Sequence, residues 1–417
     1  MAKASTFQKT VMLNGIRLVS EKIPSVRSAS LGIWVTVGSR HESEALNGIS
    51  HFIEHMAFKG TTSRSAMNIA KTIERGGGHI NAFTGKELTC FYVHVLDEQL
   101  PTAVDLLTDI LQNSVYDPAE MEKEKQVILD EIRDHEDMPD DVVHENFVGQ
   151  VYKDHPLARP ILGPPKNVSS FTREDIQGFM KEHYNPYRIV VAAAGNVKHS
   201  QLEKLIGVSL AAKGKKAKAT SQPFKKLEPG FERNSRAIQQ AHMLMGGRSI
   251  EYKSKDRVAV SMLNTVLGGG MSSRLFQNIR EKHGIAYAVY SYNDSLSDTG
   301  YYGVYLATDK QRVDRAREMV IKELVDLKER PLTKLELEEI KIQYKGGLML
   351  GLENTSSRMM RLARMEIYQG RYVPLDEISA RIDAVTPKRI QVMANQLFDE
   401  KNIVTTLLEP NGKKAQD

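Results

Sequence analysis

Hydrophobic positions along the chain follow two periods, one typical of β-strands and the other typical of α-helices. In the first half, the pattern predicts strands at residues 29–37 and 89–95 and helices at residues 50–59, 66–75, 100–113 and 117–134. In the second half, it predicts strands at residues 241–245, 286–292 and 300–307 and helices at residues 256–267 and 312–329. This mixture predicts an α+β fold, in which helices cover mostly antiparallel sheets.

The two halves of the chain resemble each other. Residues 172–191 align without a gap on residues 386–405, at a shift of 214 positions, which is half of the 417 residues. Each copy begins with a threonine that can cap a helix, continues with a helical period and ends in a buried strand. Because so long a chain is expected to form more than one domain, we interpret the repeat as two homologous domains, residues 1–210 and 224–417. The basic, small-residue stretch 211–223 is typical of an exposed linker.

Composition and charge narrow the class of protein only slightly. Hydrophobic residues make up 41% and charged residues 26% of the chain, as in an ordinary globular protein, and the mixed net charge of +5 does not indicate nucleic-acid binding. The one cysteine, Cys90, excludes an internal disulfide and a zinc site built from thiolates. We find no secretory signal and no apolar run long enough for a membrane helix, so we expect a cytoplasmic protein without membrane insertion.

The candidate chemistry lies in His51-Phe-Ile-Glu-His55, within a predicted helix for which Ser50 is a suitable cap. Residues three and four positions apart share a helix face, so both imidazoles can bind one metal ion, and Glu54 can serve as a base. Chance would give about 0.04 matches to this pattern in a chain of this composition. A third ligand is expected elsewhere, and Glu124 and Glu131 are both candidates, although an acidic helix can also be merely a solvated surface.

The motif and its surroundings resemble the pitrilysin/insulinase family of zinc peptidases, the inverzincins, and most closely the bacterial homologues of mitochondrial processing peptidase. The inverted motif is followed, 76 residues after its last histidine, by a glutamate within Val127-Ile-Leu-Asp-Glu-Ile132. The resemblance implies one zinc ion per chain, bound by His51, His55 and Glu131. It also implies that Glu54 is the general base and that Glu124 is a carboxylate hydrogen-bonded to a ligand.

The resemblance extends to two further segments. Residues 272–287 are similar to a family segment in which Arg280 and Tyr287 would contact the substrate carbonyl or the oxyanion. Residues Asn81, Ala82, Phe83 and Thr84 would form an edge strand that binds the substrate backbone, although the residues alone equally suit an ordinary strand after a glycine turn. The second half carries no HxxEH motif, which implies one metal site per chain and a substrate-binding role for that half.

The sequence therefore predicts a zinc metalloendopeptidase that hydrolyses peptides or unfolded polypeptide segments, as a homodimer. Two alternatives remain at this stage. One is a non-catalytic structural subunit, and the other is a catalytic chain that requires a different partner chain. The complete set of ligands argues against the first, and the presence of both Arg280 and Tyr287 argues against the second.

Overall fold

The computed structural model describes residues 7–210, 214 and 222–411. Most of the predicted linker 211–223 lies outside the described residues. The chain forms two compact units, and neither is a single stretch of sequence. The first unit contains residues up to 133 together with 159–222 and 351–372, and the second contains 134–158, 223–350 and the residues from 373 onward. The domain boundaries given by the repeat therefore remain a prediction. Residues 134–158, from the first half of the sequence, belong to the second unit, and residues 351–372, from the second half, belong to the first.

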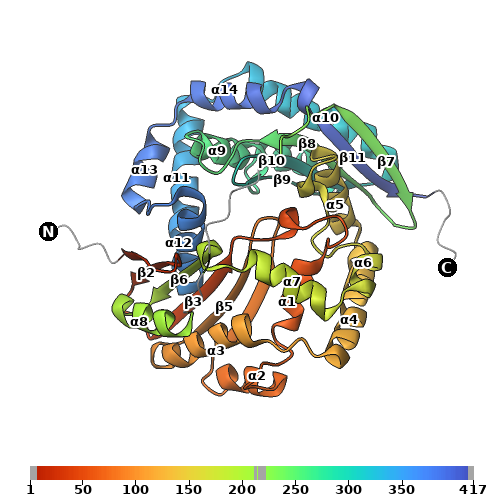
Figure 1. Cartoon of the computed structure of the whole chain (residues 1–417). Helices are drawn as coiled ribbons and strands as arrows, with labels where there is room; N and C mark the ends of the chain where they lie inside the picture. Colours follow the sequence, from red (N-terminus) through yellow and green to blue (C-terminus); the bar gives the residue numbers. More distant parts are fainter. Residues whose placement is uncertain (1–6, 211–213, 215–221, 412–417) are drawn as a thin grey trace. The chain divides into compact units, whose positions relative to one another are not determined.

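The first unit is built on a six-stranded sheet in the order β1-β2-β6-β3-β5-β4, drawn in red to yellow-green in Figure 1. Its strands are β1 Phe7–Val11, β2 Arg17–Lys22, β3 Ser28–Val35, β4 His79–Thr84, β5 Thr89–Leu96 and β6 Ile189–Gly195. Its helices are α1 Ile49–Met56, α2 Ala66–Glu74, α3 Leu100–Asn113, most of α4 Pro118–Asp137, α6 Pro165–Ser170, α7 Arg173–His183, α8 His199–Ser209 and α12 Thr355–Gln369. All neighbouring strands are antiparallel except β2 and β6. The strand β4 is therefore an edge strand.

Helices cover both faces of this sheet. Apolar side chains of α1, α3, α7 and α8 form one continuous core with β3, β5 and β6. The helix α12, from the second half of the sequence, packs on β2, β3 and β6 through its buried residues Met359 and Leu362 (Figure 1). On β3, Ser30 hydrogen-bonds Thr355 at the start of this helix at 2.8 Å. With helices on both faces, every residue of β3 after Ser28 is buried.

The second unit has a five-stranded sheet in the order β7-β11-β8-β10-β9. Its strands are β7 Gly230–Arg236, β8 Ala241–Ser249, β9 Ala286–Ser295, β10 Gly300–Thr308 and β11 Val404–Pro410. Its helices are α5 Pro139–Val151, α9 Arg257–Gly268, a π-helical segment η5 Phe276–Glu281, α10 Val313–Glu329, α11 Lys334–Gly351, α13 Leu375–Asp383 and α14 Pro387–Leu397. One face packs on α9, α10 and α14, and the other packs on α5.

The two sheets repeat the same topology. The order β2-β6-β3-β5-β4 of the first unit matches β7-β11-β8-β10-β9 of the second, and in each sheet only the first pair is parallel. Thr172 caps α7 before β6, and Thr386 caps α14 before β11, as the repeated sequence predicts. The prediction of two homologous α+β domains with mostly antiparallel sheets is confirmed. Among the described residues, no helix combines the length and the apolar character needed to cross a membrane.

Candidate metal centre

The helix α1, Ile49–Met56, carries the HxxEH motif, and it begins one residue before and ends three residues before the predicted range 50–59. Its N-cap is Gly48, whose φ of 101° lies in the left-handed region that favours glycine, and Ser50 lies inside the helix. The prediction of Ser50 as the cap is therefore wrong. The buried carboxylate of Glu42 accepts hydrogen bonds at the start of the helix instead, from the backbone N–H groups of Gly48 at 2.8 Å and Ser50 at 2.9 Å. Sequence reasoning missed Glu42, because no local pattern links it to the helix.

Helix geometry brings the two histidines together, and α4 brings a carboxylate to them. The ring centroids of His51 and His55 lie 4.6 Å apart. The Oε2 atom of Glu131 lies 3.7 Å from His51 Nε2 and 3.4 Å from His55 Nε2. In the part of the chain that the structure describes, these three residues are the group whose ligand atoms all lie close enough to hold one metal ion, within 4.8 Å of one another. Two imidazoles and one carboxylate suit catalytic zinc, which usually takes three protein ligands.

The geometry separates the roles of Glu124 and Glu131. Glu124, two helical turns before Glu131 on α4, contacts the opposite nitrogen of His55, with 2.8 Å between its Oε1 and Nδ1. Lys59, in the turn after α1, contacts the other carboxylate oxygen of Glu124 at 2.5 Å. A carboxylate that accepts from the second nitrogen of a ligating histidine fixes the ring and directs the free nitrogen toward the metal. Sequence reasoning did not identify Lys59, because no local pattern links it to Glu124, which lies 65 residues later in the chain.

Charge distribution around the histidines suits metal binding. Burial and the neighbouring His55 lower the pKa of His51 to about 4, and its Nδ1 atom is buried without a hydrogen-bond partner. Burial also lowers the pKa of His55, but its hydrogen bonds to Glu124 and Glu131 outweigh this effect and raise the pKa to about 9. The carboxylates of Glu54, Glu124 and Glu131 lie around the two imidazoles, with Lys59 beside Glu124, and nitrogen and oxygen donors of this kind suit a divalent cation.

Glu54 occupies the same helix face and connects α1 with the edge strand β4. Its Oε2 atom accepts from the hydroxyl of Thr84, the last residue of β4, at 2.6 Å. Burial raises the pKa of Glu54, and the Thr84 hydrogen bond partly opposes this shift. The free edge of β4 therefore ends beside the candidate base. Along this strand, the Ala82 N–H donates to the Asn81 side chain at 2.8 Å.

Arg280 and Tyr287 come together in the second unit. Arg280 lies near the end of the π-helical segment η5, and its guanidinium stacks on Phe276 at 4.8 Å and on Tyr287 at 5.3 Å. Tyr287 lies near the start of β9, with 75% of its surface exposed. π-helical turns often occur at functional sites. The period of the sequence did not predict this turn.

Comparisons with known proteins identify the family of the chain. Residues 17–165 match the model of insulinase (peptidase family M16), and residues 170–344 match that of the peptidase M16 inactive domain. The chain is 42% identical over 402 residues to "Uncharacterized zinc protease YmxG" of Bacillus subtilis, covering 96% of this chain and 97% of the relative. It is 38% identical to "Uncharacterized zinc protease SCO5738" of Streptomyces coelicolor, covering 98% of this chain and 91% of the relative.

Solved structures show the same fold. A protease from Helicobacter pylori superimposes with a TM-score of 0.91 at 23% identity, covering 97% of this chain and all of that one. A peptidase M16 inactive domain from Pseudomonas fluorescens gives a TM-score of 0.89 at 18% identity, covering 98% and 100%. The solved structures show the fold, and the matched family models and the relatives of 38 to 42% identity show the family. The chain belongs to the insulinase family of peptidases, M16.

Proposed function

We propose that this protein is a zinc metalloendopeptidase that hydrolyses peptide bonds in peptides or unfolded polypeptide segments. The observation that carries the proposal is the convergence of His51, His55 and Glu131 on one point, with the carboxylate of Glu54 on the same helix face. Membership of a peptidase family supplies the reaction class.

The proposed ligands are the Nε2 atoms of His51 and His55 and the carboxylate of Glu131, with one zinc ion per chain. When bound, zinc supplies a Lewis acid that lowers the pKa of a coordinated water and polarises the scissile carbonyl. Glu124 holds the His55 ring in place through Nδ1.

Glu54 is the proposed general base. The Thr84 hydroxyl engages one of its oxygens and thereby orients the carboxylate. Burial raises the pKa of Glu54, which makes the carboxylate a stronger base and a useful proton donor afterwards. Glu54 would take the proton from the attacking water and deliver it to the leaving amine.

The edge strand β4 is the proposed site for the substrate backbone. Residues Asn81, Ala82, Phe83 and Thr84 lie at an edge of the sheet, where an extended peptide can add as a further strand. Main-chain pairing tolerates many side chains, which suits a peptidase of broad specificity. We further propose that Arg280 and Tyr287 stabilise the oxyanion and that the active form is a homodimer.

The test is peptide hydrolysis by the Glu54→Gln variant, followed by mass spectrometry with and without chelator. We expect this variant to retain one zinc per chain and to lose peptide cleavage, because glutamine cannot accept the proton. Cleavage by the variant at the wild-type rate would refute the role of Glu54. Absence of zinc from the purified wild-type protein would instead favour a non-catalytic subunit, and activity only after addition of a different chain would favour a heterodimer.

A further inference from the structure

A cavity of about 440 Å³ opens in the second unit between α10 and the adjoining ends of β7 and β11. Its inner wall is apolar and includes Met245, Leu324 and Phe398, each at most 2% exposed. Ile321 and Ile403 extend this wall toward the surface. Protein cores are packed with few voids larger than a water molecule, whereas sites for small molecules measure some hundreds of Å³. The size and the lining of this cavity are those of a ligand site.

One charged side chain in the cavity lacks a partner. The Nε atom of Arg317, on α10, is buried and makes no hydrogen bond. The Arg317 guanidinium lies 5.5 Å from the ring of Phe231, and that of Arg233 lies at the same distance from this ring. Stacking holds the Arg317 guanidinium in place, but it does not provide an acceptor for Nε. Nε itself has almost no accessible surface, so an occupant of the cavity would meet the rest of the guanidinium. Arg317 lines the cavity and forms no ion pair or hydrogen bond with the described residues, so its positive charge is available to an anionic ligand.

The chemistry of the wall defines the class of ligand. An arginine binds a carboxylate with two parallel hydrogen bonds, and an apolar wall binds an aliphatic or aromatic tail. Glu400 also lines the cavity and disfavours a dianion more strongly than a monocarboxylate. We propose that this cavity binds a small monocarboxylate with an apolar tail, with its carboxylate on Arg317 and its tail against Met245 and Leu324.

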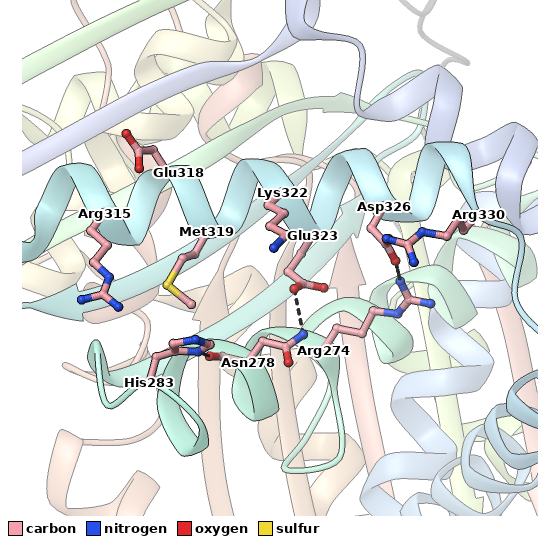
Figure 2. A pocket seen from close by; sticks show the side chains of 10 residues that line it. All are labelled: Arg274, Asn278, His283, Arg315, Glu318, Met319, Lys322, Glu323, Asp326 and Arg330. Carbon is pink, nitrogen blue, oxygen red and sulfur yellow. Dashed lines mark hydrogen bonds and ion pairs between the residues drawn. The ribbon is translucent and has the colours of Figure 1, made fainter.

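A second hollow on α10, of about 590 Å³, does not carry the same inference (Figure 2). Two contacts join its lining residues, as Arg274 pairs with Asp326 at 2.5 Å and Asn278 donates to Glu323 at 2.7 Å. Apart from Met319 its lining is polar or charged, so it lacks the apolar wall that would bind a hydrocarbon tail. It does provide a control, because Arg315 lines it and lies only two residues from Arg317 on the same helix.

The test is titration with octanoate, octan-1-ol and a short peptide ending in leucine, followed by isothermal calorimetry. Carboxylates also bind zinc, so each titration is made on the zinc-loaded protein and again in the presence of chelator. We expect octanoate to bind saturably and equally under both conditions. The alcohol, which has the same tail and no charge, should bind at least tenfold more weakly.

Two variants locate the binding. Arg317→Met should weaken octanoate binding at least tenfold, whereas the control Arg315→Met should leave it unchanged. Val325→Trp, which fills the cavity from α10, should abolish binding of both the acid and the alcohol, and it carries the test if Arg317→Met fails to fold. Equal octanoate binding by wild type and Arg317→Met would overturn the proposal, as would binding that disappears with chelator. Binding of the peptide in preference to octanoate would also overturn it, because the occupant would then be a chain terminus.

Discussion

Replacing Glu124 with glutamine tests whether the contact between this residue and His55 controls metal affinity. Glu124 is 4% exposed, contacts His55 Nδ1 at 2.8 Å and Lys59 Nζ at 2.5 Å, and does not reach the proposed metal position itself. Glutamine has the same shape, but its bond to His55 loses the ionic contribution. Loss of a partner of this kind typically weakens metal binding 10- to 100-fold, or by about 1.4 to 2.7 kcal/mol. Lys59 is 31% exposed in its side chain and can turn to solvent, so folding should change little.

The measurement is competition for zinc between the protein and a fluorescent chelator, made on wild type, Glu124→Gln and a control. The matched control is Glu120→Gln on the same helix, because Glu120 forms only a solvent-exposed pair with Lys123 at 2.6 Å. We expect weaker zinc binding for Glu124→Gln alone and recovery of its peptidase activity at saturating zinc. Equal zinc affinities for all three proteins would show that the Glu124 contact does not act on the metal site.

Two further predictions concern the stability of the region before α1, and both are measured by urea denaturation in chelator. Glu42→Ala leaves the donors of Asn47, Gly48 and Ser50 without their buried acceptor. The free energy of unfolding should therefore fall by about 3 to 5 kcal/mol. An unchanged midpoint of urea denaturation would refute this role of Glu42. Burial, Arg188 and Arg40 lower the pKa of His41 from 6.5 to about 4, so the unfolded chain binds the proton first as pH falls. The free energy of unfolding should therefore decrease as the pH falls from 6.5 to 4, by up to about 3 kcal/mol. If the free energy of unfolding depended on pH equally in wild type and His41→Asn, His41 would not be the group responsible.

The candidate site was predictable where local geometry determines it. The period of a helix alone places His51, Glu54 and His55 on one face, and the structure has them there. The choice between Glu124 and Glu131 was open, because residues seven apart share a face of α4 and only the approach of α1 distinguishes them. Glu131 meets the Nε2 atoms of both histidines, whereas Glu124 meets Nδ1 of one.

The exchange of helices between the units was not predictable from the pattern. An amphipathic period shows that one face of α5 or α12 is buried, but it does not show which sheet buries it. The boundary inferred from the repeat assigns α5 to the first half and α12 to the second, whereas their contacts are with the opposite sheets. Information of this kind lies in the complementarity of two distant surfaces, which no local window of sequence contains.

The repeated topology also explains why the fold could be duplicated without its metal site. In the chain, α9 follows β8 as α1 follows β3, and each helix packs beside its sheet. A sheet and its covering helices require only apolar residues at the right period, and α9 satisfies this with Val258, Met262 and Leu263. A metal site requires particular donors at particular positions, and beyond its first residue α9 contains no ionisable side chain. The second unit can therefore keep the fold while carrying other chemistry, such as the pair Arg280 and Tyr287 and the cavity beside Arg317.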